Sequence, residues 1–269
     1  MVVIGIGSAG CNIASCFSQG HKKILFDASK FPSTCKTVED YEKKCPSFKK
    51  ELSFKQNECW VFLCGAGKVA GASLRILEKI KNKKINIVYI CPDPLLATPI
   101  EIKRNKVTFN ILQEYARSGL LNSIYLVSNK EMFDIMGQGP ISSIYENANK
   151  SLANIVETVE YFKNTKPVLG SLAEPKEISR IRTFGIGVVE KNEEKLLFPL
   201  DNLTETSYIY SVSQDELDQQ NDLLYDIKEK ISKDKDNNIL SSFSIFSSIH
   251  EQSFFYSIKS THYIQKENK

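Results

Sequence analysis

The segment Gly5-Ile-Gly7-Ser-Ala-Gly10 constrains the fold of this chain more than any other stretch. It follows a short apolar and β-branched run, Val2 to Ile6, which predicts a buried strand, and it precedes a helical pattern from about Cys11 to Gln19. Glycines spaced as G-x-G-x-x-G at a strand-to-helix junction let backbone N–H groups and a helix N-terminus approach phosphate oxygens, because no side chain blocks the way. The chain therefore begins with a predicted phosphate-binding turn; a tight turn that binds no ligand is the alternative.

A second glycine cluster stands at another strand-to-helix junction. The run Cys59 to Leu63 predicts a strand, and Cys64-Gly-Ala-Gly67-Lys-Val-Ala-Gly71-Ala-Ser73 follows it. It is not a Walker loop, since no glycine stands five residues before the pair Gly67-Lys68. Two such turns in one sheet favour a polyphosphate held from two sides, although the second cluster alone also fits a plain glycine-rich connection.

Strands and helices alternate through the first half of the sequence. The strand-like runs are closed by polar residues or proline, among them Asp27, Pro92 and Asn129. These runs cover residues 2–6, 24–26, 59–63, 85–90 and 124–127. The alternation predicts an α/β fold with a Rossmann-like parallel sheet covered by helices on both faces.

A long helical pattern then breaks this rhythm. From Ile141 to Lys163 apolar residues recur at steps of three or four, which predicts one long central helix. Ser213 and Glu216 further on have the spacing of a capping box. The elements predicted beyond the long helix are a strand at 208–212, a helix at 213–231 and strands at 239–246 and 254–264. We therefore expect a smaller α+β domain in the C-terminal part.

Composition restricts the class of protein further. With 42% hydrophobic and 25% charged residues, the 269-residue chain is expected to be globular and soluble, which excludes a disordered, collagen-like or coiled-coil protein. No apolar run approaches the roughly 20 residues that cross a bilayer, and the start at Met1 lacks the pattern of a signal peptide, so we expect no transmembrane segment and a cytoplasmic location. The 7 Cys are scattered and the 3 His do not join them at metal-ligand spacing, which favours reduced thiols and no metal site.

The basic residues argue against nucleic acid as a partner. Only five of the 35 Lys and Arg residues are Arg, the residue that best reads bases and phosphates. The most lysine-rich stretch, Lys22 to Lys55, is interrupted by acidic residues. We therefore expect a solvated surface there and no direct sequence-specific nucleic-acid binding.

Asp27 leaves a different class of protein open. It closes the strand-like run that follows the first glycine turn, where a flavin or nicotinamide enzyme places the acid that binds its ribose. A flavin- or NAD-binding Rossmann oxidoreductase is therefore an alternative.

Features along most of the chain resemble the FtsZ/tubulin superfamily. The most specific is Gly5-Ile-Gly-Ser-Ala-Gly10-Cys-Asn12, which is close to the family's first phosphate loop. The others are the second glycine cluster, the strand ending in Cys-Pro92-Asp-Pro94, the helix with Ala116 and Leu120, the strand ending in Ser-Asn129, and the long helix with Ala148-Asn149 followed by a small domain. The resemblance is to a shortened, divergent member of the bacterial or phage type, and it runs from Val2 to about Ile264.

The resemblance implies a GTPase-like nucleotide-binding domain over residues 1–140, a central helix over 141–166 and a small α+β domain over 167–269. The ligand that it implies is GTP or GDP, with or without Mg²⁺. The residues that it assigns to the ligand are Gly7, Ser8, Gly10, Cys11 and Asn12 in the first loop, Gly65, Ala66, Gly67, Lys68 and Gly71 in the second, and Asn129 and Asn149 on the base side. An amide suits guanine because it offers both a donor and an acceptor, although a local hydrogen bond is an equal explanation for each asparagine alone.

The sequence also departs from the family's pattern. The family's second loop reads Gly-Gly-Gly-Thr-Gly-Thr-Gly, whereas here Lys68, Val69 and Ala70 interrupt the glycines and both threonine hydroxyls are missing. The stretch 34–58 lacks the glycine-bearing loop near the terminal phosphate, and little of the family's helix is visible between Ile186 and Tyr208. We therefore expect poor sensing of the bound nucleotide.

The resemblance implies self-association as well. In the family, a loop after the central helix brings acidic residues to the nucleotide of a neighbouring subunit, so that subunits join head to tail into filaments. That loop, Asn-x-Asp-Phe-Ala-Asp, corresponds here to Leu169-Gly-Ser171-Leu-Ala-Glu174, which makes Glu174 the catalytic candidate. Leu169 and Ser171 replace the family's Asn and first Asp, and this missing acidic residue predicts weak or absent GTP hydrolysis. Together with the changed second loop, it leaves a non-hydrolysing degenerate scaffold as an alternative. An unidentified adaptor or cargo protein is a further implied partner.

Overall fold

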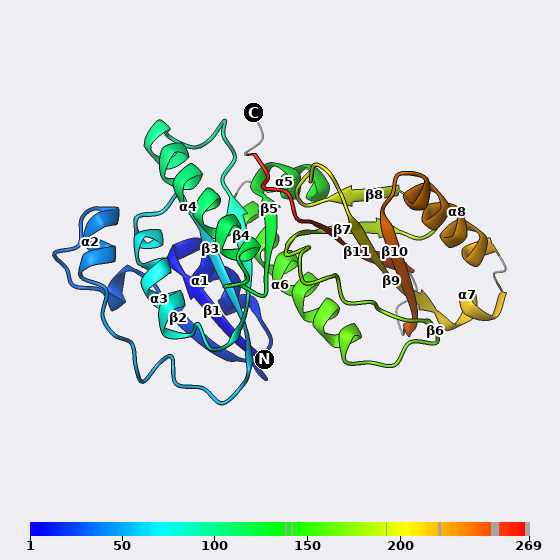
Figure 1. Ribbon diagram of the computed structural model, residues 1–269, viewed down its shortest axis with the longest axis horizontal. Helices are drawn as coiled ribbons and strands as arrows, with labels where there is room; N and C mark the ends of the chain where they lie inside the picture. Colours follow the sequence, from blue (N-terminus) through cyan, green and yellow to red (C-terminus); the bar gives the residue numbers. More distant parts are fainter. Residues whose placement is uncertain (138, 141, 192, 220–221, 249–252, 267–269) are drawn as a thin grey trace. The chain divides into compact units, whose positions relative to one another are not determined.

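The structure is a computed structural model that describes residues 1–137, 139–140, 142–191, 193–219, 222–248 and 253–266 (Figure 1). The chain divides into two compact units. The first unit comprises Met1–Asn154 with Ile264–Lys269, and the second comprises Ile155–Tyr263. Within the ranges above, no helix has both the length and the apolar character needed to cross a membrane.

The first unit is built on a parallel sheet of five strands in the order β2, β1, β3, β4, β5. All four neighbouring pairs of strands are parallel. Its elements are β1 (Val2–Ile6), α1 (Gly7–Cys16), β2 (Lys22–Phe26), η1 (Ala28–Lys30), α2 (Val38–Lys43), β3 (Glu58–Cys64), η2 (Lys68–Ala72), α3 (Ser73–Lys79), β4 (Lys84–Cys91), α4 (Pro99–Arg117), β5 (Ser123–Ser128) and α5 (Asn129–Met136). The predicted α/β fold with a parallel sheet is confirmed.

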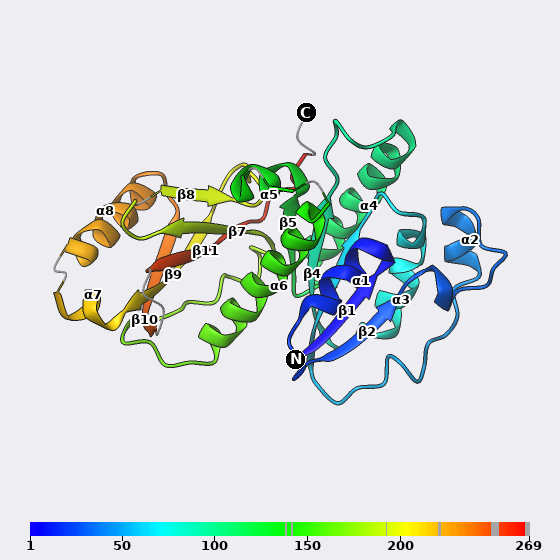
Figure 2. The ribbon, with the colours of Figure 1, turned by 180° about the vertical axis from the view of Figure 1, so that it is seen from behind.

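Helices cover both faces of this sheet, which explains the nearly continuous apolar sequence of its strands. Every residue of β1 and β5 is buried. Figures 1 and 2 show α3 and α4 over one face and α1 over the other. Trp60 of β3 is fully buried, and its ring centre lies 5.1 Å from that of Tyr125 of β5. Strands that meet helices on both faces need apolar side chains on both, so their sequence does not alternate.

The long central helix is α6, Ile144–Lys163. Its buried residues recur at helical spacing, as the sequence predicted, and include Leu152, Val156 and Val159. The predicted first residue, Ile141, lies outside the described residues. The boundary between the two units falls within this helix.

The second unit has a mixed sheet in the order β7, β11, β9, β10, β6, with β8 paired to β7. Its elements are β6 (Leu169–Gly170), β7 (Ile181–Val188), β8 (Glu193–Leu196), β9 (Glu205–Ser213), α7 (Gln214–Gln219), α8 (Asp222–Asp236), β10 (Leu240–Ser248) and β11 (Phe254–Thr261). Strands β9 and β10 are parallel and the other pairs are antiparallel. Leu223 and Ile227 of α8 pack with Tyr210 and Phe255 of the sheet into one apolar core.

Two features of the second unit differ from the sequence prediction. No strand was predicted at β7 and β8, because Gly185 and Gly187 interrupt the apolar pattern of β7. These glycines give room to neighbouring strands, since a Cβ on Gly187 would lie 2.3 Å from the ring of Phe255. Likewise, the sequence predicts a loop at Leu169–Gly170, but these residues form β6 and pair antiparallel with β10.

Candidate functional site

The two glycine loops lie at the point where the strand order of the first unit reverses. The first loop follows β1 and the second follows β3, and these strands are neighbours in the sheet. From β1 the chain moves outward to β2, whereas from β3 it moves the other way to β4. Open α/β sheets bind ligands outside the carboxyl ends of the strands at such a switch point.

The first loop is shorter than predicted, because α1 begins at Gly7 rather than near Cys11. Only Gly7 needs a left-handed backbone conformation, with φ of +73°. The residue before the helix, Ile6, offers no side-chain cap, and Ser8 in the first turn is exposed. The first N–H groups of α1 therefore receive no bond from a capping side chain and form a donor set that suits an anion.

Gly5 and Gly10 allow close packing of α1 on the sheet. A Cβ on Gly10 would lie 2.0 Å from the carbonyl oxygen of Phe62 in β3, and one on Gly5 would lie 2.6 Å from the Cα of Cys11. Without these Cβ atoms α1 lies directly on β1 and β3. The thiol of Cys11 donates to the carbonyl oxygen of Gly5 at 3.4 Å, so this side chain faces the sheet.

In the second loop only one of the three predicted glycines borders open space. Gly67 is exposed, and a Cβ there would have no neighbour within 4 Å. A Cβ on Gly65 would lie 1.9 Å from the hydroxyl oxygen of Tyr89, and one on Gly71 would lie 2.2 Å from the carbonyl oxygen of Val38. These two glycines are therefore explained by packing, while Gly67 remains open to a ligand.

The rest of the second loop is helical. Lys68 begins η2 and is exposed, and Ala66 is buried. A Cβ on Gly7 would lie 3.7 Å from the Cβ of Val69, so the first loop and η2 face each other across a short distance. The open positions Gly7, Gly67 and Lys68 thus belong to one region of the first unit.

All three predicted asparagines line one cavity of about 220 Å³. Asn12 comes from α1, Asn129 from the start of α5 and Asn149 from α6. The remaining lining is mostly apolar and consists of Ala9, Ile13, Ile90, Val127, Met132, Tyr145, Ala148 and Leu152. Pockets for whole ligands usually measure about 300–1,000 Å³, so this cavity suits a part of a ligand such as a base.

Tyr145 is a lining residue that the sequence analysis missed. It lies one helical turn before Asn149, its side chain is 54% exposed, and its ring centre lies 5.2 Å from that of Phe133. An exposed aromatic ring beside amide groups can stack on a planar ligand. The i, i+4 spacing to Asn149 was the signal that was available in the sequence.

Asp27 is engaged in its own turn. Its carboxylate accepts hydrogen bonds from the backbone N–H of Ser29 at 2.8 Å and from the Ser29 hydroxyl at 2.5 Å. These bonds to Ser29 hold the pKa of Asp27 below its ordinary value. A local N-cap of η1 explains this residue without a dinucleotide.

Glu174 belongs to the second unit and lies on an exposed segment between β6 and β7. That segment is fixed on both sides of the residue. The hydroxyl of Ser207 donates to the carbonyl oxygen of Ala173 at 3.0 Å, and the N–H of Lys176 donates to Glu205 Oε2 at 2.9 Å. The structure therefore presents Glu174 to solvent on a well-anchored backbone.

Solved structures similar to this chain come from the tubulin and FtsZ fold. CetZ from Methanosaeta thermophila matches with a TM-score of 0.73 and 14% identity, over 97% of this chain and 86% of that one. An empty FtsZ dimer from M. jannaschii matches with a TM-score of 0.71 and 13% identity, over 97% and 87% of the two chains. A GTPγS-form protofilament of TubZ from Bacillus thuringiensis serovar israelensis matches with a TM-score of 0.68 and 10% identity, over 96% and 86%.

The fold of this chain is therefore that of the tubulin/FtsZ proteins. The sequence matches no protein-family model and no curated protein. The resemblance predicted from the glycine loops and the long helix is confirmed at the level of the fold.

Proposed function

We propose that the first unit binds GTP or GDP between the two glycine loops and the asparagine-lined cavity. The observation that carries this proposal is the convergence of Asn12, Asn129 and Asn149 on one cavity from three separate elements. The phosphates would lie at the uncapped start of α1, with Gly7 and Ser8 on one side and Gly67 and Lys68 on the other. The bound nucleotide supplies the phosphoanhydride that hydrolysis would cleave.

The residues present fit such a ligand. Backbone N–H groups at the start of α1 are donors for phosphate oxygens, and the ammonium of Lys68 adds positive charge opposite them. Asn129 and Asn149 each offer a donor and an acceptor to a base edge, and the exposed ring of Tyr145 offers a stacking surface.

We further propose that copies of the chain join head to tail. The similar TubZ structures are protofilaments, and a head-to-tail contact joins two different surfaces, so it propagates into a filament. In such a contact Glu174 would meet the nucleotide of the next subunit. Because Leu169 and Ser171 stand where the family carries polar and acidic residues, we propose slow or absent hydrolysis.

A non-hydrolysing scaffold is the second candidate function. The structure of the second loop favours it, because packing explains Gly65 and Gly71 and only Gly67 borders open space. Such a scaffold would work through the surfaces that bind its partners, and its nucleotide site would be vestigial.

The first experiment is to denature gently purified protein, resolve the released compounds by chromatography, and titrate the protein with GTP, GDP, ATP, NAD and flavin. Near-stoichiometric guanine nucleotide, or selective GTP affinity, supports the proposed site, and conversion of bound GTP to GDP on standing supports hydrolysis. If the protein releases no nucleotide and shows no affinity for GTP, the non-hydrolysing scaffold becomes the preferred function. Released flavin or NAD would overturn the guanine site.

Sedimentation with each nucleotide at high protein concentration tests the proposed filaments. The absence of assembly under every condition would contradict the head-to-tail proposal.

A further inference from the structure

Two short segments carry most of the large apolar and aromatic side chains that the described part of the chain leaves exposed. Of the 14 such side chains, eight lie within residues 95–107 and 161–178. We call the first four the α4 patch and the second four the β6 patch. They are Leu95, Leu96, Ile100 and Val107 in the α4 patch, and Tyr161, Val168, Leu169 and Ile178 in the β6 patch. Exposed apolar side chains that are grouped in this way mark a surface that meets a partner.

The α4 patch is held in place by its backbone. The N–H groups of Leu95 and Leu96 donate to the carboxylate and the carbonyl oxygen of Asp93, at 2.9 and 3.1 Å. The N–H of Thr98, the residue before α4, donates to Glu101 Oε2 at 2.9 Å. None of the first six residues of α4 is buried. The two leucines are therefore presented to solvent on a fixed turn, which loses little freedom when it binds.

The β6 patch is anchored in a similar way. The N–H of Val168 donates to the carbonyl oxygen of Ile245 at 2.7 Å, and the N–H of Ser171 donates to that of Phe243 at 3.0 Å. These bonds fix β6 on β10, while both residues of β6 stay exposed. Glu174 follows on the same segment. The apolar side chains beside Glu174 are therefore also presented on a fixed backbone.

Each patch borders a surface that the proposed head-to-tail contact uses. The α4 patch follows the carboxyl end of β4, whose Ile90 lines the asparagine-lined cavity. In the β6 patch, Leu169 precedes Glu174 in the sequence and Ile178 follows it. A contact that brings Glu174 to the nucleotide of the next copy therefore also brings the β6 patch close to the α4 patch of that copy.

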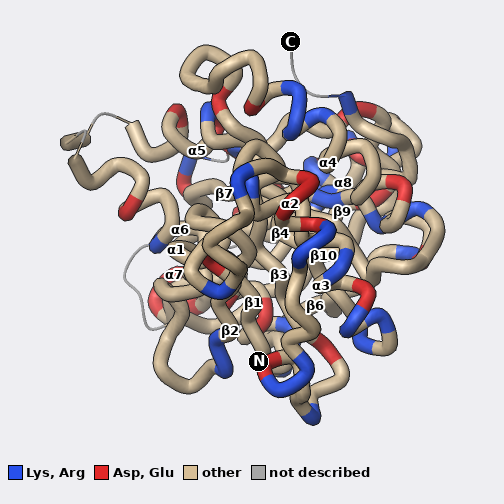
Figure 3. Tube along the Cα trace, turned by 90° about the vertical axis from the view of Figure 1, so that its left-hand side faces the viewer, with Lys and Arg blue, Asp and Glu red and all other residues tan. Residues whose placement is uncertain are grey.

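Opposite charge does not explain how these patches would attract a partner. Residues 93–107 contain three basic and two acidic residues, and residues 161–178 also contain three and two, so each segment has a net charge of +1. Figure 3 likewise shows basic and acidic segments close together around α2 and α3. Two surfaces with the same small charge can attract each other only through their apolar side chains.

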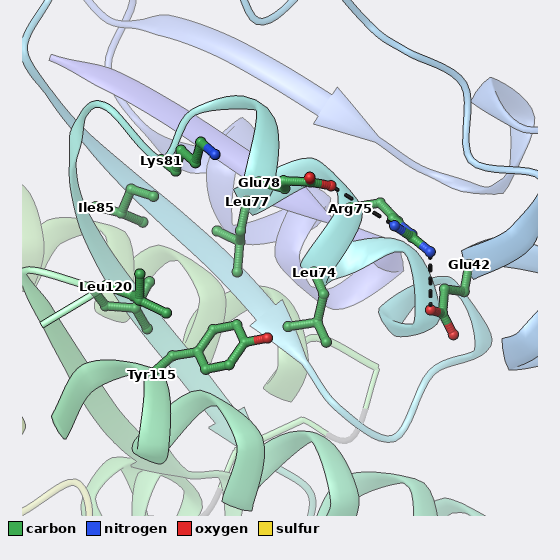
Figure 4. Close-up of a pocket in the computed structure, with 10 residues that line it drawn as sticks. Glu42, Leu74, Arg75, Leu77, Glu78, Lys81, Ile85, Tyr115 and Leu120 are labelled. Atoms are coloured by element: carbon green, nitrogen blue, oxygen red, sulfur yellow. Dashed lines mark ion pairs between the residues drawn. The ribbon is translucent and has the colours of Figure 1, made fainter. Parts of the chain in front are cut away.

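A cavity between α3 and α4 offers no comparable surface (Figure 4). It measures about 440 Å³, and the charged residues in its lining are two acidic and two basic. Its Arg75 already lies 3.7 Å from Glu42 and 3.9 Å from Glu78. These charges are balanced within the cavity, so they favour no charged partner.

We propose that the α4 patch of one copy packs on the β6 patch of the next, so that the head-to-tail contact is apolar and forms without bound nucleotide. This inference rests on the proposed head-to-tail association and assigns the surfaces that carry it. No patch residue lines the asparagine-lined cavity or belongs to a glycine loop, so the nucleotide does not contribute to either surface. Leu169, which stands where the family carries asparagine, adds apolar area to the contact.

The test is sedimentation velocity over a range of protein concentrations, with GTP, with GDP and without nucleotide. Wild type should associate to a similar extent in all three conditions. Leu95→Asp with Leu96→Asp should weaken association at least about tenfold, and so should Val168→Asp with Ile178→Asp. Added salt should not weaken the association of wild type, because the contact gains nothing from opposite charges.

The matched control is Leu224→Asp with Tyr225→Asp. It adds the same charges at two exposed apolar residues of α8 that lie outside both patches, and it should leave association unchanged. Unchanged melting temperatures show that all the variants are folded.

A mixture of the two patch variants tests whether the patches are the two halves of one contact. Each variant keeps one intact patch, so an equimolar mixture should form dimers that neither variant forms alone. A photo-crosslinker in place of Leu96 tests the geometry directly. In a mixture of isotopically light and heavy protein, its crosslinks should reach residues 161–178 of the other copy.

The outcomes separate this inference from the proposed function. Association that persists in either patch variant, a mixture without dimers, crosslinks to another surface, or association that requires GTP would each overturn the inference and leave the head-to-tail proposal standing. A wild-type chain that binds GTP but stays monomeric at every concentration would contradict both. Association through the two patches in a chain without GTP affinity would support the inference and contradict only the nucleotide site.

Discussion

Asn129 and Asn149 line the same cavity, although one begins α5 and the other lies in the first half of α6. Neither is fully buried, so both amides remain accessible. The end of β5 fixes the position of Asn129, and the packing of α6 on the first unit fixes that of Asn149. Two amides held by independent elements can recognise a base edge without rearranging, which gives the first prediction.

If the first unit binds guanine nucleotide as proposed, replacing Asn149 should weaken that binding selectively. We expect Asn149→Ala to lower GTP affinity about tenfold, the effect of losing one or two hydrogen bonds to the base, and to narrow the preference for GTP over ATP. The measurement is isothermal titration with both nucleotides. Asn147→Ala is the matched control, since Asn147 lies on the same helix, is exposed and does not line the cavity. Equal affinities of the two variants would contradict the role of Asn149.

Substitution of Gly67 should affect ligand binding, whereas substitution of Gly10 should affect stability. Gly67→Ala should leave the free energy of unfolding within about 0.5 kcal/mol of wild type but lower GTP affinity, because its Cβ would enter the open space proposed for phosphate. Gly10→Ala should destabilise the protein by about 3 kcal/mol or more, because its Cβ meets a backbone carbonyl of β3. Urea unfolding and GTP titration measure the two effects. Gly20→Ala is the control, because a Cβ there meets open space and no ligand is proposed beside it; stability and GTP affinity should both stay unchanged. A Gly10→Ala variant as stable as wild type would show that α1 can shift away from β3.

Gly67 and Gly10 also show how much of the fold and the site can be predicted from the sequence alone. The strands of the first unit were predictable because burial on both faces leaves continuous apolar runs, and the spacing of Gly5, Gly7 and Gly10 marked the first loop. The same spacing cannot tell a glycine that faces a ligand from one that faces Phe62, since that contact comes from a distant strand. Long-range contacts likewise decide that Gly65 abuts Tyr89.

Other features of the structure were not predicted for the same reason, because they depend on contacts between distant parts of the chain. Strand β7 was not predicted because its glycines replace apolar residues where neighbouring side chains need room. The place of Tyr145 beside the asparagines depends on how helices pack, and a periodic pattern identifies a helix without identifying what lies beside it. Sequence patterns thus predicted elements and loops, whereas the composition of each cavity required the structure.

Glu174 should affect turnover without affecting binding. If it positions water at the nucleotide of a neighbouring copy, Glu174→Gln should lower any GTP hydrolysis at least about tenfold at unchanged GTP affinity. Phosphate release measured over a range of protein concentrations checks this. Glu177→Gln is the control, because Glu177 is also exposed and lies on the same segment. Unchanged turnover in the Glu174 variant would remove its assigned role.

Stability should fall at alkaline pH through Cys59. Burial, with a smaller effect of the Glu58 carboxylate, raises the pKa of this thiol from 9.0 to about 12. Below pH 9 both states keep the proton, and the contribution of the neutral thiol is complete. Between pH 9 and about 12 the unfolded chain loses the proton that the folded chain keeps, so the free energy of unfolding falls by up to about 1.4 kcal/mol per pH unit.

The comparison that isolates this thiol is wild type against Cys59→Ala, unfolded in urea at several pH values from 8 to about 11. The variant should lose stability less steeply above pH 9, because the remaining tyrosines, lysines and thiols titrate in both proteins. Identical slopes would mean that Cys59 ionises in the folded protein as readily as in the unfolded chain.

The last prediction concerns an ion pair within the second unit. Lys259 Nζ lies 3.0 Å from Glu194 Oε2, and the side chains are only 8% and 19% exposed. The hydroxyl of Ser257 donates to the other carboxylate oxygen of Glu194. Glu194→Ala should therefore cost about 3–5 kcal/mol, because it leaves the ammonium of Lys259 buried without its partner.

The double variant Glu194→Leu with Lys259→Met should recover most of that loss, since an apolar pair of similar volume avoids the desolvation of both charges. Glu146→Ala is the control, because the Lys150–Glu146 pair is more than 60% exposed on both sides and should contribute less than about 1 kcal/mol. Urea unfolding measures all four proteins. If Glu194→Ala lowered the free energy of unfolding as little as Glu146→Ala, water would have to reach Lys259 in the folded protein. The Lys259–Glu194 pair would then count as a surface interaction.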